Sequence, residues 1–236
     1  MKILFSIIAM LALWGNVQAT DLKNNNIQPD PQARLAGEIF VFSIVSHGSQ
    51  YFNDEWYLGD VTLRSGEVVE DQMLKYNGYL DELIWLNTSF QNIKVDKNLV
   101  AEFNISDPHT QETFVFRNVL LNSLSIGGSG HIFAEQLYEN DISLMTFRRI
   151  LKTGERTENR TKSVISRAIL KPDPVYFILM PDGNANILSN LSRRSFYRAF
   201  PDHKDEIRSM FRQNQLRLRN ERDLIEAVKI IEKVVF

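Results

Sequence analysis

The sequence predicts an α+β protein whose larger part is antiparallel β structure and whose C-terminal part is helical. Apolar and polar residues alternate along most of the first 190 residues, and Ser-Gly and Asn-Gly steps separate the runs. This pattern is typical of successive hairpins, and it predicts about ten to twelve strands in a sandwich or an open or half barrel. After Asn190 the apolar spacing becomes helical, which predicts about two or three short helices packed on the β portion.

The stretch from Trp56 to Asn104 is the part of the chain around which the other elements are arranged. Its apolar residues keep a period of two on either side of the Ser65-Gly66 and Asn77-Gly78 turns, which is a strong short-range signal for hairpins. The apolar run LIWL contains Trp85, and we expect this side chain to be largely buried.

Further strands flank this stretch on both sides. The run EIFVFSIV at 38–45 is too continuously apolar to have a solvent-exposed face, which predicts a central strand or a strand covered on both faces. TGERTENRTK at 153–162 contains no apolar side chain and is interpreted as a polar loop, and the glycine-rich run at 125–130 as a turn. The remaining apolar runs predict strands at 113–121, 131–137, 142–151 and 175–180.

The C-terminal helices carry their own start signals. Ser192 can cap a short helix, Pro201-Asp202 opens a second, and Asn220 can cap the last. An apolar stripe of helical period runs along this last helix and needs a surface to cover. We expect it to dock on the protein's own sheet, and the alternative is a detachable arm that docks on another protein. The stripe consists of Leu224, Ile225, Val228 and Ile231.

The start of the chain reads as a secretory signal peptide. Lys2 supplies a positive charge, an apolar run of h-region length follows, and Val17-Gln18-Ala19 places small residues where a signal peptidase cleaves. The rival interpretation is a buried N-terminal helix. The predicted organisation is a signal peptide at 1–19, a flexible lead-in at 20–35, a β-rich domain at 36–190 and a helical segment at 191–236 packed on that domain.

The absence of cysteine limits what an exported chain of this kind can be. No disulfide can form, no thiolate can hold zinc or an iron–sulfur cluster, and no cysteine can carry a lipid anchor. No apolar run after the leader is long enough to cross a bilayer as a helix, so we expect no transmembrane segment in the mature chain. These features predict an exported protein that is not a lipoprotein, in the periplasm or associated with the outer membrane.

No local motif for chemistry stands out, so the sequence predicts no catalytic, cofactor-binding or metal site. None of the four histidines lies within four residues of another, and neither a phosphate-loop lysine nor a G-x-S-x-G elbow is present. The adjacent pairs Asp54-Glu55 and Asp81-Glu82 point to opposite faces of a strand, so neither forms an acid–base pair by itself. A dispersed site, such as His131 with a distant carboxylate, stays open.

Charge is distributed unevenly although the net charge is only −2. Eight acidic residues face two basic ones between Asn53 and Glu82, whereas eight basic residues face two acidic ones between Thr146 and Lys171. Nine basic residues face four acidic ones between Arg193 and Arg222. Such segments can attract polyanions or an anionic membrane surface, or can simply be solvated. The candidate anion or membrane-surface patch comprises Arg148, Arg149, Arg193, Arg194, Arg198, Arg208 and Arg212.

Two stretches carry a resemblance. KYNGYLDEL at 75–83, with the VDKNLVAEF run that follows, and the ending from Arg193 to Val228 resemble secreted proteins of the Bacteroidota that have no assigned activity. The resemblance implies a β-rich body with a helical C-terminal tail in the envelope of a Gram-negative bacterium. Because the shared motifs are structural, the resemblance implies no active-site residues for this chain.

Three functional hypotheses follow. The first is an exported, non-enzymatic cell-envelope protein that binds another envelope or outer-membrane protein as an accessory or assembly subunit, without a cofactor. The second is a barrel-like carrier of an apolar ligand such as a lipid, which would show a large apolar pocket. The third is a hydrolase, which would show converging carboxylates of raised pKa in a cleft. Export argues against nucleic acid as a partner.

Overall fold

The computed structural model describes residues 35–41, 44, 46–121, 130–160 and 163–235. Strands occupy most of this part of the chain up to Leu188, and three helices follow. The strands are β1 (Gly37–Ile39), β2 (Ser46–His47), β3 (Tyr57–Leu63), β4 (Val68–Asn77), β5 (Glu82–Leu86), β6 (Asn92–Val95), β7 (Val100–Ser106), β8 (Thr113–Leu121), β9 (Gly130–Glu139), β10 (Ser143–Phe147), β11 (Ile150–Arg160), β12 (Ser163–Pro172), β13 (Val175–Leu179) and β14 (Ala185–Leu188). The helices are α1 (Arg193–Ala199), α2 (Lys204–Gln213) and α3 (Glu221–Val235). The predicted α+β class is confirmed.

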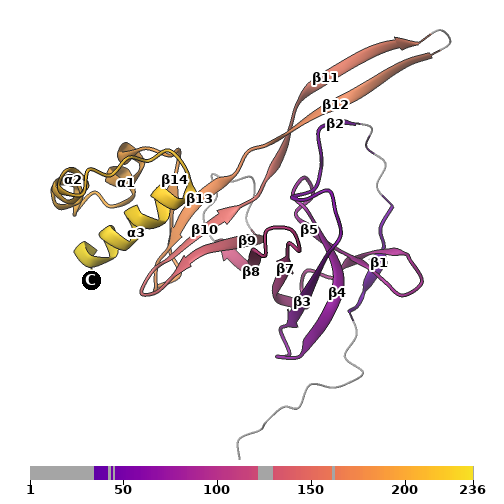
Figure 1. Cartoon of the computed structure of the whole chain (residues 1–236), viewed down its shortest axis with the longest axis horizontal. Coiled ribbons are helices and arrows are strands. Elements are labelled where there is room, and N and C mark those ends of the chain that lie inside the picture. Colours follow the sequence, from indigo (N-terminus) through magenta and orange to yellow (C-terminus); the bar gives the residue numbers. More distant parts are fainter. Residues whose placement is uncertain (1–34, 42–43, 45, 122–129, 161–162, 236) are drawn as a thin grey trace, which may run out of the picture.

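One large antiparallel sheet forms the body. Its eleven strands follow the order β1-β6-β5-β4-β3-β7-β8-β9-β10-β13-β14, and β11, β12 and β2 form a separate three-stranded sheet in which β2 is parallel to β12. The helices lie at the β13–β14 end of the body, and β11 and β12 extend away from it as a long two-stranded ribbon (Figure 1). We call this ribbon, residues 150–172, the arm.

The first half of the large sheet curls around an aromatic cluster. Three strands separate β4 from β9, so in a flat sheet these two would lie about 19 Å apart at the usual strand spacing. The rings of Tyr76 on β4 and Phe133 on β9 are nevertheless 6.4 Å apart, and Phe103 and Phe116 stack on each other beside them at 4.8 Å. The sheet must therefore bend strongly, which gives this half the character of an open barrel filled with side chains.

Asp81 holds this curl together from the turn between β4 and β5. Its carboxylate accepts hydrogen bonds from the Tyr76 hydroxyl at 2.8 Å, the Phe133 amide at 3.2 Å and the Lys97 ammonium at 2.6 Å. Asp81 adopts a left-handed backbone conformation with φ of 57°, which Asp tolerates better than most residues. One carboxylate therefore joins β4, β9 and the turn before β7.

A second core lies between the other half of the sheet and the three helices. Leu224, Val228 and Ile231 of the predicted stripe are fully buried, and Ile225 is half-buried. The Asn220 side chain accepts a hydrogen bond from the Asp223 amide at 3.0 Å, so the predicted cap of α3 is present. The last helix thus docks on the protein's own sheet, as expected. The other buried members of this core are Ile142, Leu144, Tyr176, Ile178, Leu188, Phe196, Phe200, Ile207, Phe211 and Ala227.

Several predictions of strands and burial are wrong in detail. At 38–45, the only strand among the described residues is the short edge strand β1. Ile39 and Val41 are 63% and 85% exposed, because β1 pairs with β6 alone and no other described segment covers it. The prediction for Trp85 is confirmed in part, because this side chain packs against the aromatic cluster and is partly rather than fully buried. The described residues of the predicted polar loop, 153–160, belong to β11 instead.

Other expectations fall outside the described residues. These include the signal peptide at 1–19, most of the lead-in at 20–35 and, apart from Gly130, the glycine-rich turn at 125–130. Within the described part of the chain, no helix combines the length and apolarity that a bilayer crossing requires.

Glu232 is the polar anchor of α3 on the sheet. This buried side chain accepts hydrogen bonds from the Tyr138 hydroxyl at 2.7 Å, the Asn140 amide at 3.1 Å and the Ile142 backbone at 3.1 Å. Burial alone would raise the pKa of Glu232, but these donors outweigh it and lower the pKa below its usual value of 4.5. The anionic form is therefore the one that clamps the helix.

We expect Glu232→Gln to lower the free energy of unfolding by about 1–3 kcal/mol near pH 7, because at least one donor loses its acceptor. A carboxyl whose pKa is depressed by folding contributes stability above its unfolded value of 4.5, and this contribution is lost as the pH falls through the folded value. The gap between wild type and variant should therefore narrow below about pH 4.5 in denaturant titrations.

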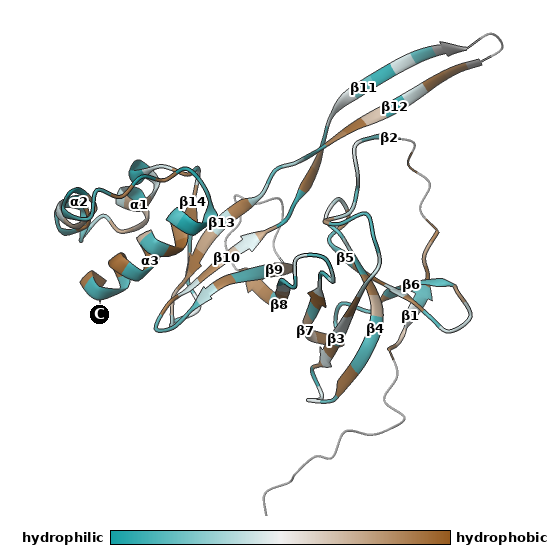
Figure 2. Cartoon of the chain, viewed as in Figure 1, coloured by the Kyte–Doolittle hydropathy of each residue, from teal (hydrophilic) through white to brown (hydrophobic). Residues whose placement is uncertain are grey.

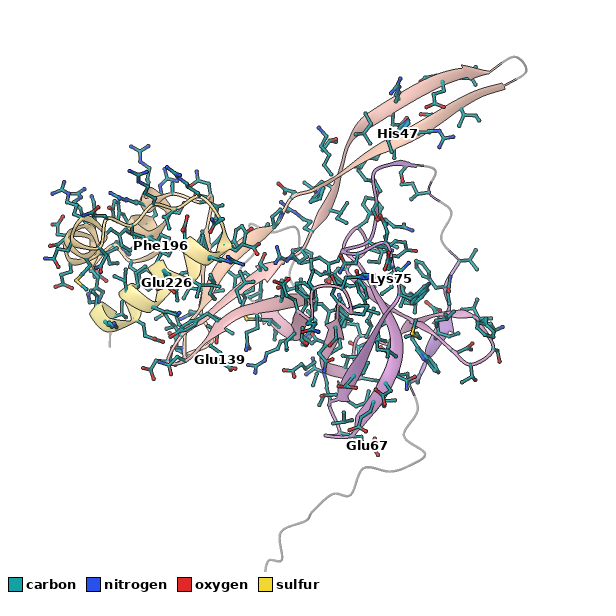
Figure 3. The ribbon with its side chains drawn as sticks, in the orientation of Figure 1. His47, Glu67, Lys75, Glu139, Phe196 and Glu226 are labelled. Carbon is teal, nitrogen blue, oxygen red and sulfur yellow. The ribbon has the colours of Figure 1, made fainter. Side chains whose placement is uncertain are left out.

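Glu226→Gln is the matched control, because Glu226 lies exposed on the same helix and pairs only with Lys229 across one turn (Figure 3). It should change stability by less than about 0.5 kcal/mol. Equal losses in the two variants would contradict the role assigned to Glu232.

Candidate functional site

Beyond its base, the arm extends away from the body of the described chain (Figure 1). β11 and β12 pair antiparallel from Ile150 opposite Pro172 to Arg160 opposite Ser163, with one irregularity between Lys152 and Gly154. β11 is mostly hydrophilic, whereas β12 carries more apolar residues (Figure 2). Because most of this ribbon covers no other element, it keeps no continuous apolar face, and period-two reasoning cannot recognise it as a strand.

The base of the arm is anchored to the body. Ile150, Ala168 and Leu170 form a small buried cluster against Tyr79 and Ile44. The Ile150 amide donates to the Gly78 carbonyl at 3.0 Å, which fixes the start of β11 on the turn after β4. β2 adds two residues in parallel beside β12, and there His47 contacts Glu158 at 3.0 Å (Figure 3).

Beyond its base the arm carries Arg156 and Arg167 on one face of the ribbon and the exposed Val164 on the opposite face. Arg156 stands directly opposite Arg167, and like charges in this position destabilise a strand pair. Glu158 offsets part of this repulsion through an ion pair with Arg167 at 3.3 Å. Val164 is 70% exposed near the far end. The outer edge of β11 pairs with no strand of the described chain, so its backbone donors and acceptors are open.

Arg148 does not belong to a surface patch, although the sequence placed it in one. It lies in the two-residue link between β10 and β11 and is largely buried. Its guanidinium donates to Glu135 on β9 and in bidentate fashion to Glu221 at the start of α3, and it also stacks 5.4 Å from the centre of the Phe52 ring. This residue is an internal ion-pair hub.

The other six arginines separate into two groups. Arg149 forms an ion pair with Asp173, and Arg193 donates to the Leu216 carbonyl. Arg212 is exposed on α2. Arg194, Arg198 and Arg208 do come together, because they line one surface hollow between α1 and α2. The hollow also contains Lys204 and Tyr197, which the predicted patch did not include.

Two carboxylates have the raised pKa that the hydrolase hypothesis requires. Burial raises the pKa of Asp81, although the nearby Lys97 ammonium acts to lower it. Burial likewise raises the pKa of Glu135, although the Arg148 guanidinium acts to lower it. Each is therefore bound to a different cation, and each contributes hydrogen bonds to the packing of the body. The arrangement resembles structural ion pairs rather than an acid–base pair that faces a cleft.

The described residues also bear on whether the protein could hold a metal ion or an apolar ligand. No group of three or more His, Asp or Glu side chains in the described chain has the geometry to hold a metal ion. A hollow of about 570 Å³ beside β1 and β6 is lined by Asp81, Glu82, Lys94 and Lys97 together with a few apolar residues. Aromatic rings fill the interior of the curled sheet instead. Neither place offers the apolar chamber that a lipid carrier requires.

Comparison with known proteins gives no further guidance. No protein-family model matches the chain, and neither a curated protein nor a solved structure matches it.

We expect Arg148→Met to lower the free energy of unfolding by about 3–5 kcal/mol, because Glu135 is left buried without its cation. In this variant Glu135 should take up a proton more readily, with its pKa raised further. A carboxyl with a raised folded pKa is least costly when protonated, so the deficit should shrink as the pH is lowered toward 4 and grow toward neutrality.

Denaturant titrations at several pH values measure this effect. Arg212→Met removes the same charge from an exposed position and should cost less than about 0.5 kcal/mol. A loss of that small size in Arg148→Met, or one that does not change with pH, would contradict the hub assignment.

Proposed function

We propose that this chain is an exported, non-enzymatic protein of the cell envelope that binds another envelope protein through the arm. The observation that carries the proposal is the open ribbon of β11 and β12, which is anchored at its base and exposes side chains and one strand edge beyond it. An exposed strand edge is a frequent recognition surface, because a partner strand can pair with it through backbone hydrogen bonds.

Energetic considerations support a binding role for the arm. A two-stranded ribbon that packs on nothing is marginally stable in water, and this one also places Arg156 opposite Arg167. A partner that covers the ribbon and presents carboxylates to these guanidiniums would relieve both costs. We therefore propose a partner whose docking strand or groove presents acidic side chains to the face of the arm that carries Arg156 and Arg167.

Two sequence features support the proposed location. The leader at 1–19 and the resemblance to secreted proteins of the Bacteroidota favour export to the periplasm or to the outer membrane. Export would bring the arm within reach of other envelope proteins.

Export predicts that the protein recovered from the envelope fraction of an expressing Gram-negative host begins at Thr20. Intact-mass measurement checks this start, because removal of residues 1–19 changes the mass by a defined amount. A chain that retains Met1 would contradict the proposed location.

The two other hypotheses are less well supported. A carrier would need an apolar chamber, whereas the curled sheet is filled by Tyr76, Phe103, Phe116 and Phe133. A hydrolase would need a free carboxylate of raised pKa, whereas Asp81 and Glu135 are bound to internal cations. Binding through the arm is the function that we therefore propose.

Site-specific photo-crosslinking in envelope preparations tests the arm directly. A benzophenone amino acid at position 164 should give a defined adduct with one envelope protein. The same group at position 90 should not, because Phe90 is 85% exposed but lies in the turn between β5 and β6, away from the arm. Adducts of equal yield at both positions, or none at position 164, would contradict the proposal.

Arg156→Glu separates binding from folding. It places an acid opposite Arg167 and should leave the melting temperature unchanged or raise it slightly, since opposite charges across a strand pair are favourable. The adduct at position 164 should nevertheless weaken, because the acidic partner now meets a carboxylate. An undiminished adduct would contradict the proposed chemistry of the partner.

A further inference from the structure

The hollow between α1 and α2 is lined almost entirely by cationic side chains. Its lining consists of Arg194, Tyr197, Arg198, Lys204 and Arg208, and its volume is about 390 Å³, within the range of small-molecule sites. Arg194 and Arg198 are one helical turn apart on α1, and Lys204 and Arg208 are one turn apart on α2. Each pair therefore lies on one face of its helix.

These cations have little internal compensation. Arg194, Arg198 and Lys204 form no hydrogen bond or ion pair with any residue in the described ranges, and the one carboxylate that Arg208 meets there is that of Asp205 at 3.3 Å. Asp205 is almost fully exposed, and an exposed pair of this kind contributes little. Four positive groups around one hollow therefore repel one another and produce a strongly positive potential.

The helices that carry these groups are held rigidly from behind. Phe196 of α1 and Phe211 of α2 are fully buried and meet edge to face, with ring centroids 5.5 Å apart (Figure 3). Tyr197 packs on Phe211 at 6.3 Å, and the Arg208 guanidinium lies 5.5 Å from the Tyr197 ring. The distance between the two cationic faces is thus set by an apolar core and does not depend on a ligand.

We propose that this hollow binds a phosphate group carried by a larger molecule. Three guanidiniums provide planar pairs of donors that match phosphate oxygens, and the ammonium of Lys204 adds a fourth charge. Tyr197 offers an aromatic surface to the group that carries the phosphate. This function goes beyond partner binding by the arm and is independent of it. The phosphate can belong to a lipid headgroup or to a soluble phosphorylated compound.

Inorganic phosphate is the first probe, titrated into the isotope-labelled full chain and followed by the amide signals of α1 and α2. Saturable shifts are expected in wild type, with binding weakened about tenfold or more in the double variant Arg194→Gln/Arg198→Gln. The double variant Arg217→Gln/Arg219→Gln is the control, because it removes two exposed charges of the α2–α3 connection outside the hollow lining. It should bind as wild type does.

Vesicles distinguish the two sources of phosphate. Co-flotation with phosphatidylcholine vesicles that contain phosphatidylglycerol, but not with phosphatidylcholine alone, would assign a lipid headgroup if Arg194→Gln/Arg198→Gln abolishes it and the control does not. Phosphate binding without flotation would assign a soluble compound. Lys204→Gln/Arg208→Gln should reproduce the loss and serves as the readout if the first variant fails to fold.

The proposal is overturned if neither inorganic phosphate nor anionic vesicles bind to the full chain. It is also overturned if the control pair loses as much affinity as the hollow variants, because the effect would then reflect net charge alone.

Discussion

The ion-pair hub at Arg148 is the constraint on which the arrangement of the other parts depends. One guanidinium joins β9 through Glu135, the start of α3 through Glu221, and the segment before β3 through the Phe52 ring. The hub lies where the chain leaves β10 and enters β11, next to the base of the arm. Arg148 and Glu135 are largely buried, so loss of the Arg148 guanidinium leaves the Glu135 carboxylate without its cation. These buried contacts of Arg148 therefore connect β9, the start of α3 and the base of the arm.

The two cores make these connections necessary. The aromatic cluster fills the curled half of the sheet, whereas the helix-covered core fills the half around β10 and β13. β9 takes part in both, since Phe133 belongs to the first and Tyr138 packs against the second. Polar anchors accompany each core: Asp81 closes the curl and Glu232 clamps α3. A protein without disulfides thus uses buried, fully partnered carboxylates to fix the relation between its apolar layers.

The proposed functions use surfaces that these cores leave exposed. The arm departs from the sheet at the hub, and the phosphate hollow lies on helices whose opposite faces are buried. The same apolar side chains that hold α1 and α2 together keep the cationic faces a fixed distance apart. Rigid support of this kind lowers the entropy that ordering flexible arginines would otherwise cost on binding.

Local sequence determined the elements that bury an apolar face of regular period. The hairpins between residues 56 and 104, the α3 stripe and its Asn220 cap follow from spacing and turn chemistry, which operate over a few residues. Only the tertiary structure decided that EIFVFSIV begins at an exposed sheet edge and that the polar run at 153–160 is a strand. It also decided that Arg148 is buried, whereas Arg194 and Arg198 line the same surface hollow. The physical reason is that burial and charge pairing depend on which distant segments meet. A ribbon that covers nothing has no apolar period for sequence reasoning to detect, and an arginine shows no sign in the sequence of whether a carboxylate 73 residues away will reach it.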